Sequence, residues 1–328
     1  MSKIGERELN RAPGILAAIG NTPIVELENL RRELGFRGRI LAKLEYLQPG
    51  LTKKTRVARQ VILDGLETGT LKAGQMVIEA TSGNTGTGLA IVCAVLGHPF
   101  TAVMSKGNSV ERVLMMRAMG ASVVLVDQRR DSVVGRVTGD DFARVEEATE
   151  SLVARTGAFR ANQFESTSNT RAHYLGTAPE FWDQSHQSLQ AFVHFTGTGG
   201  AFAGCMNYFS EVCAGFRGYV VEPEGAAALS GGRPSGRGHV IQGGGYSRSV
   251  LPLLTGVEIT GFLSVRDQAA VDGCHILARR EGIFAGYSSG ANLMAAVDLL
   301  RSHDEDVTVG ILLSDSGLKY ASTGLFTA

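Results

Sequence analysis

Short apolar runs rich in β-branched residues alternate with longer amphipathic segments through most of this 328-residue chain. In the first half three such pairs follow one another: residues 76–80 and 87–97, 100–104 and 109–120, and 122–126 and 140–157. A second series has runs at 191–197, 217–223 and 307–314 and a helical pattern at 202–215. Because parallel strands need long, usually helical connections, this alternation predicts parallel sheets with crossover helices. Two series predict two α/β lobes.

Composition narrows the class of ligand. The chain has 32 basic and 32 acidic residues, so no global field favours nucleic acid or an anionic membrane surface. The sequence has no run of about 18 or more apolar residues, so it predicts no membrane span, and residues 1–14 lack an apolar signal core. Four cysteines lie singly in apolar stretches, which predicts buried thiols in a reducing cytoplasm: Cys93, Cys205, Cys213 and Cys274. We expect a cytoplasmic protein with small-molecule ligands.

A basic run, GLTKKTR at residues 50–56, precedes a helical pattern. Thr52 is a candidate N-cap for a helix from Lys53, and cations at a helix N-terminus need an anion nearby. At about 100° per residue, Lys54 faces the same way as the apolar residues that follow, whereas Lys53 faces outward. A solvated surface patch is the alternative interpretation. A lysine directed at a core has the depressed pKa that a Schiff-base lysine needs.

Two strand-turn-helix segments have turns of glycine and hydroxyl residues. Residues 81–86 read TSGNTG and residues 197–200 read GTGG. Backbone N–H groups and the helix dipole converge on such turns, which suits an anion. Neither turn fits the Walker or dinucleotide pattern, and each alone is equally well a glycine-rich corner. Two anion sites and one inward amine together predict pyridoxal phosphate on Lys54, beside a substrate that carries a carboxylate.

Ordered motifs along nearly the whole chain resemble the cysteine synthase and cystathionine β-synthase family of pyridoxal-phosphate enzymes. They include GNTPIVELENL, AKLEYLQPGLTKKTRVA, EATSGNTGTGLA, TGTGGAFAG, HVIQGGG, EGIFAGYSSGAN and LLSDSGLKYAST. The resemblance implies the tryptophan-synthase-β type of fold, which has two α/β lobes with the cofactor in the cleft between them. It also implies a larger domain of residues 1–45 and 158–328, a smaller mobile domain of residues 46–157, and a homodimer.

Matching this family position by position assigns roles to individual residues. Lys54 falls on the Schiff-base lysine, Asn84 on the residue that hydrogen-bonds the ring hydroxyl, and Ser316 on the serine that faces the pyridine nitrogen. The cofactor phosphate would be held by Gly197, Thr198, Gly199 and Gly200. The substrate carboxylate would be bound by Thr81, Ser82, Thr85 and Gln163. A neutral hydroxyl at the ring nitrogen favours β-elimination over transamination. No metal site is expected, and His173 and His239 are interpreted as structural.

The sequence departs from the family pattern near the expected cofactor. Leu51, Lys53 and Thr55 replace the usual glycine, valine and aspartate, and Ala201 replaces a phosphate-binding threonine. Residues 244–249, GGYSRS, replace a small apolar run. We hypothesise that Arg248, or its neighbour Tyr246, lies over the cofactor and selects a nucleophile larger or more acidic than sulfide; the alternative is an arginine that points to solvent.

The expected reaction is β-replacement on an activated serine through an aminoacrylate, with Lys54 as the general base. Two alternatives stay open. The first is β-elimination to pyruvate and ammonia, which uses the same residues. The second is a non-catalytic paralogue with a regulatory role.

Overall fold

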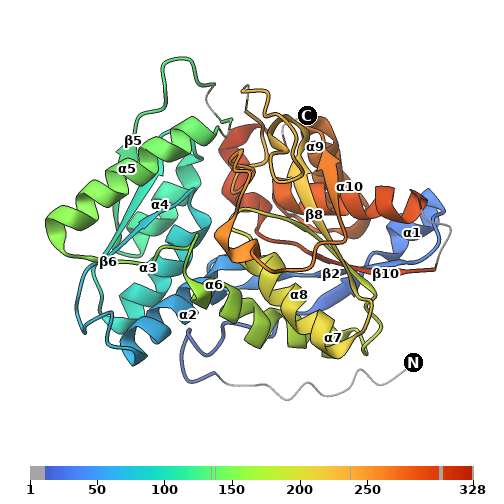
Figure 1. The fold of residues 1–328 in the computed structure, drawn as a ribbon, viewed down its shortest axis with the longest axis horizontal. Helices are drawn as coiled ribbons and strands as arrows, with labels where there is room; N and C mark the ends of the chain where they lie inside the picture. Colours follow the sequence, from blue (N-terminus) through green and yellow to red (C-terminus); the bar gives the residue numbers. More distant parts are fainter. Residues whose placement is uncertain (1–11, 134, 137, 237, 303–305, 327–328) are drawn as a thin grey trace.

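The computed structural model describes residues 12–133, 135–136, 138–236, 238–302 and 306–326. Residues 1–11, most of the segment in which no signal core is expected, lie outside this range. Two β-sheets form the centres of two lobes that lie side by side (Figure 1). The predicted two-lobed α/β architecture is therefore confirmed. Within the described residues no helix is both long and apolar enough to cross a membrane.

The larger sheet has six strands in the order β1-β2-β10-β7-β8-β9. Every neighbouring pair is parallel except β1 and β2. The strands are β1 (Ile24–Glu26), β2 (Arg39–Lys43), β7 (Ala191–Phe195), β8 (Arg217–Pro223), β9 (Gly261–Val265) and β10 (Thr308–Leu312). The central strands are buried on both faces, which explains their continuous apolar runs.

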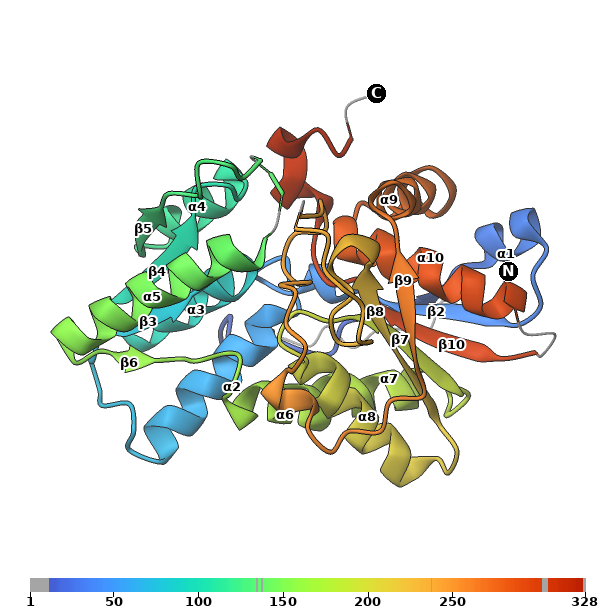
Figure 2. The same cartoon turned by 45° about the horizontal axis from the view of Figure 1, so that its top comes forward.

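Helices cover both faces of the larger sheet, as Figure 2 shows. Successive strand residues point to opposite sides. Val193 packs in the core with α1 (Glu28–Leu34), α9 (Asp267–Glu281) and α10 (Tyr287–Ser302), whereas Phe192 packs in the core with α7 (Ala178–Gln184) and α8 (Gly200–Val212). Cys205 and Cys274 are buried in these cores as predicted, but Cys213 is only partly buried because it follows the last residue of α8.

The smaller sheet has four parallel strands in the order β5-β4-β3-β6. They are β3 (Val77–Ala80), β4 (Phe100–Ser105), β5 (Ser122–Val126) and β6 (Phe159–Arg160). Helix α5 (Gly139–Thr156) covers one face, and α2 (Lys54–Glu67), α3 (Asn84–Leu96) and α4 (Val110–Ala118) contribute to the core on the other. The division at residues 45–46 and 157–158 stays a prediction; β6, which follows residue 158, pairs with β3 of this sheet.

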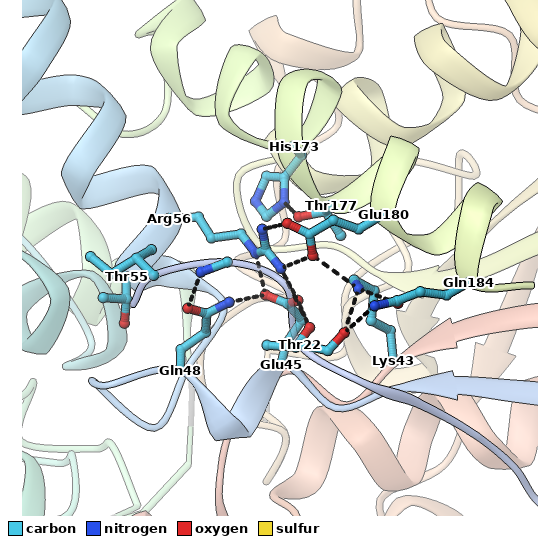
Figure 3. A network of polar contacts seen from close by, with 12 residues as sticks. Thr22, Lys43, Glu45, Gln48, Thr55, Arg56, His173, Thr177, Glu180 and Gln184 are labelled. Carbon is cyan, nitrogen blue, oxygen red and sulfur yellow. Dashed lines mark hydrogen bonds and ion pairs between the residues drawn. The ribbon is translucent and has the colours of Figure 1, made fainter. Parts of the chain in front are cut away.

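A buried ion-pair network fixes the start of α2 to the larger lobe (Figure 3). The Arg56 side chain is 2% exposed. It donates to both carboxylate oxygens of Glu45, each at 2.8 Å, and to both oxygens of Glu180 in α7, at 2.7 and 2.6 Å. Lys43 lies 3.0 Å from the same Glu180 carboxylate. The guanidinium thus holds two elements of the larger lobe against a helix that packs on the smaller sheet.

We predict that Glu45→Gln lowers the free energy of unfolding by about 3–5 kcal/mol, because the substitution leaves the buried Arg56 charge short of a partner. Urea unfolding followed by the fluorescence of Trp182 measures the change. Asp127→Asn is the control, since that carboxylate pairs with Lys106 at the surface and its loss changes stability by less than about 1 kcal/mol. If both substitutions changed the unfolding free energy equally, the Glu45–Arg56 pair would contribute no more than a surface ion pair, contrary to this prediction.

Candidate active site

A cavity of about 610 Å³, counted with its part open to solvent, lies between the two lobes. Its lining comes from the start of α2 and from the segments that follow β3, β6, β7 and β10. Ligands of open parallel sheets bind at the carboxyl ends of the strands. The topology therefore brings several distant motifs of the sequence to one place.

The glycine turn after β7 forms one wall of the cavity. Gly197, Thr198 and Gly199 line it, and α8 begins at Gly200. Gly199 has φ +86°, and a Cβ there would lie 2.8 Å from Leu254, so glycine is required. The N-cap residue Gly199 has no side chain, and the Thr198 hydroxyl accepts the Gly200 N–H at 3.3 Å. The following N–H groups of the first turn are available to an anion. Gly200 does not line the cavity but packs closely against Asn169.

The turn after β3 forms the opposite wall. Ser82 and Thr85 line the cavity together with Gln163, which follows β6. The Thr85 hydroxyl donates to Gln163 Oε1, and Gln163 Nε2 donates to the Ala80 carbonyl at 2.8 Å. Thr81 does not line the cavity: its hydroxyl accepts the Gly83 and Gly86 N–H groups and so shapes the turn. A carboxylate-binding role for Thr81 would require that turn to open.

Asn84 lines the cavity at the start of α3, and its amide is held by the segment that follows β10. Its Nδ2 donates to Asp315 at 2.8 Å, and its Oδ1 accepts from Lys319 Nζ at 3.0 Å. Burial lowers the pKa of Lys319 to about 7, although the Asp315 carboxylate opposes the shift. The Arg112 guanidinium donates to Oε1 of Gln242 at 2.8 Å, and Gln242 lines the cavity.

The serine expected to face the pyridine nitrogen does not reach the cavity. Ser316 caps the following turn, where its hydroxyl accepts the Leu318 N–H at 3.2 Å. Ser288 at the start of α10 and Ser314 directly after β10 line the cavity instead. Among the described residues Ser314 Oγ is buried without a hydrogen-bond partner. The role of Ser316 stays a prediction, but of these three serines Ser288 and Ser314 are the two that line the cavity.

Both lysines of the basic run line the cavity, so the prediction that Lys53 faces outward is wrong. Lys53 is only 9% exposed, and its Nζ contacts His194 Nε2 of β7. Helical phase failed because α2 begins at Lys54, one residue later than predicted, and its first turn is inserted between the lobes and covered on both sides. Thr52 still accepts the Lys54 N–H at 3.3 Å.

The predicted inward orientation of Lys54 fits the structure. Its Nζ lies 3.3 Å from the hydroxyl of Thr198 in the glycine turn. Burial lowers the pKa of Lys54 to about 8 and that of Lys53 to about 7, the latter helped by the neighbouring Lys54 charge. Sequence reasoning missed His194, because a histidine within an apolar strand carries no signal of a partner elsewhere in the chain. His173 and His239 are hydrogen-bonded, to Thr177 and the Gly245 carbonyl.

These groups suit a phosphorylated aldehyde. The Lys54 amine lies beside the glycine turn at the N-terminus of α8, and the unpartnered Ser314 hydroxyl lies in the same cavity. Residues 15–315 match the family model described as pyridoxal-phosphate dependent enzyme. The chain belongs to the cysteine synthase family of pyridoxal-phosphate-dependent enzymes. Its cofactor is pyridoxal 5′-phosphate, as the motifs predicted.

Relatives in this family resemble the chain over nearly its full length. A cysteine synthase of Dictyostelium discoideum is 31% identical, over 94% of this chain and 83% of the relative. The crystal structure of O-acetyl serine sulfhydrylase isoform 3 from Entamoeba histolytica matches with a TM-score of 0.88 and 32% identity, over 100% of this chain and 95% of that one. An O-acetylserine dependent cystathionine beta-synthase from Helicobacter pylori matches with a TM-score of 0.88 and 30% identity, over 96% and 99%.

The depressed pKa of Lys53 predicts a pH-dependent gain in stability for Lys53→Met. In the unfolded chain the amine titrates near 10.5, so its burial is destabilising, fully below pH 7 and progressively less as the pH rises toward 10.5. The gain in unfolding free energy should be about 2–3 kcal/mol larger at pH 6 than at pH 9. Urea unfolding at both pH values measures it, with the exposed Lys72→Met as the control. A gain independent of pH would refute a buried, titrating Lys53.

Proposed function

We propose that the protein catalyses β-replacement on an activated serine-type amino acid, in the manner of a cysteine synthase. One observation carries this proposal: a single cavity joins the Lys54 amine, the glycine turn after β7 and the hydroxyl-rich turn after β3. Bound to the substrate amino group, pyridoxal phosphate withdraws electrons from the α-carbon and so eases loss of the α-proton and of a β-substituent.

Different residues of the cavity bind the cofactor, bind the substrate and remove the proton. Thr198 and the N–H groups at the start of α8 hold the phosphate, and Ser82 and Thr85 with Gln163 hold the substrate carboxylate. Lys54 removes the α-proton, a role supported by its pKa of about 8, which leaves part of the amine unprotonated at neutral pH. Ser314, with its unpartnered hydroxyl, or Ser288 would offer a hydroxyl to the ring nitrogen in place of Ser316.

Tyr246 is the better candidate of the two loop residues for selecting the second substrate. It lines the cavity, and its ring stacks on Phe142 of α5 at 4.3 Å. The Arg248 guanidinium lies over the rings of Phe142 and Phe164, at 5.2 and 4.5 Å, and does not line the cavity. Arg248 thus packs on the two phenylalanines that also contact Tyr246, and we do not assign it a contact with the nucleophile. Because it lies over these rings, it does not simply point to solvent.

A substrate screen tests the reaction. O-acetylserine, O-phosphoserine, serine and cysteine are offered with and without sulfide, while absorbance, cysteine, pyruvate and ammonia are followed. Formation of cysteine supports replacement, whereas pyruvate and ammonia alone support the elimination alternative. A protein that changes absorbance with none of the four would fit the non-catalytic alternative. Gel filtration with light scattering checks the homodimer, which with a cytoplasmic location is part of the same proposal.

We predict that Lys54→Ala abolishes both the visible absorbance of the bound cofactor and all turnover, because the Lys54 Nζ is the amine that lies beside the glycine turn, 3.3 Å from the Thr198 hydroxyl. Lys53→Ala should keep the absorbance band. Spectra of the two purified variants decide between the lysines. A band lost in Lys53→Ala and kept in Lys54→Ala would reverse the assignment.

Tyr246→Ala should widen the choice of nucleophile, because the phenol limits the room beside the substrate. Competition between sulfide and larger thiols measures the change, and we expect the ratio to move toward the larger thiol by about tenfold, the scale of one or two methylenes in a pocket. Arg248→Ala, which leaves the lining intact, should change this ratio much less. The opposite ranking of the two variants would return the selecting role to the arginine.

A further inference from the structure

Lys53 and His194 form a buried pair within the cofactor cavity, apart from the lysine that binds the cofactor. Lys53 directly precedes α2, and His194 lies in β7 and is 1% exposed. Both line the cavity, and Lys53 Nζ contacts His194 Nε2. In a hydrogen bond between a lysine nitrogen and an imidazole nitrogen, one nitrogen must donate and the other must accept. The neighbouring groups determine which of the two carries the proton.

Asn292 in α10 determines which nitrogen of the His194 imidazole carries no proton. Its Oδ1 accepts the Phe195 N–H at 2.6 Å, and its Nδ2 donates to the Leu312 carbonyl at 2.8 Å. These two backbone contacts fix the orientation of the amide. The same Nδ2 lies 3.3 Å from His194 Nδ1. An amide nitrogen only donates, so Nδ1 must be the acceptor.

The tautomer then fixes the state of Lys53. Burial holds the pKa of His194 well below its usual value, so the imidazole is neutral. A neutral imidazole with a bare Nδ1 carries its proton on Nε2, the nitrogen that faces Lys53. That N–H donates to Lys53 Nζ, which must offer a lone pair. Lys53 is therefore a free amine in this arrangement.

The charges around Lys53 are consistent with a free amine. His173, from the π-helical turn His173–Thr177, and the Cys205 thiol of α8 are buried and neutral, and their pKa values are shifted toward the neutral form by burial. Lys54 on α2 opposes a second cation, whereas the Glu45 and Asp315 carboxylates favour one. In the part of the chain that the structure describes, no carboxylate is within ion-pair distance of Lys53. Burial outweighs the two carboxylates.

We propose that Lys53 is a second, uncharged amine of the active site, held in its free-base form through His194 by Asn292. Its one lone pair accepts the His194 Nε2–H, so Lys53 lines the cavity as a neutral polar group and adds no second positive charge beside Lys54. This proposal rests on the cofactor cavity alone.

The direct test is an NMR pH titration of the holoenzyme carrying ¹³Cε-labelled lysine, with the Lys53 signal assigned by its loss in Lys53→Met. We expect Lys53 to titrate near pH 7. Asn292→Asp replaces the donor with a carboxylate that accepts from Nδ1–H, which moves the bare nitrogen to Nε2 and favours the Lys53 ammonium. The titration should then rise by about 2 pH units or more.

Two results would overturn the proposal: a wild-type Lys53 that titrates near pH 10, or a folded Asn292→Asp holoenzyme in which the titration does not rise. If Asn292→Asp fails to fold, the wild-type titration still decides. A protein inactive in the substrate screen would defeat the proposed function but leave the titration result intact.

Discussion

The position of Lys54 depends on the buried guanidinium of Arg56 two residues later. Arg56 is bound by Glu45 and Glu180 of the larger lobe, while the rest of α2 packs on α3 against the smaller sheet. A buried charge without its partners is strongly destabilising, so the start of α2 cannot leave the larger lobe at low cost. The helix is thus held by both lobes at the place where its first turn meets the cavity. The Lys54 amine therefore owes its position to this ion-pair network.

Parallel topology supplies the rest of the cavity from distant parts of the chain. The glycine turn follows β7, the hydroxyl-rich turn follows β3, and Ser314 follows β10. In each sheet the strands run in the same direction apart from β1, so their carboxyl ends lie along one edge. Residues far apart in sequence meet there without any local signal that they will do so. The chemistry of the site therefore follows from the connection rule of the sheets as much as from the motifs.

Local patterns predicted the elements well, because burial on both faces leaves continuous apolar runs and crossover helices leave amphipathic ones. The strand at residues 217–223 has the predicted bounds, and both turns predicted to bind anions precede helices as expected. Side-chain direction was predicted less well. The helical phase of α2 placed Lys54 correctly but failed for Lys53, since the phase assumes one face in solvent and this turn has none. Ser288 and Ser314 lie in the quoted motifs EGIFAGYSSGAN and LLSDSGLKYAST, but the motifs do not say which of their serines reaches the cavity. His194 carries no local signal, because only the tertiary fold brings it to Lys53.

The amide of Asn84 has a consequence for motion between the lobes. This residue starts a helix of the smaller lobe, yet both its polar atoms bind the segment after β10, through Asp315 and Lys319. Rotation of one lobe away from the other would leave these buried groups unpaired, and each such loss costs about 1–3 kcal/mol. Separation of the two lobes at this point would therefore break the hydrogen bonds of Asn84 with Asp315 and Lys319.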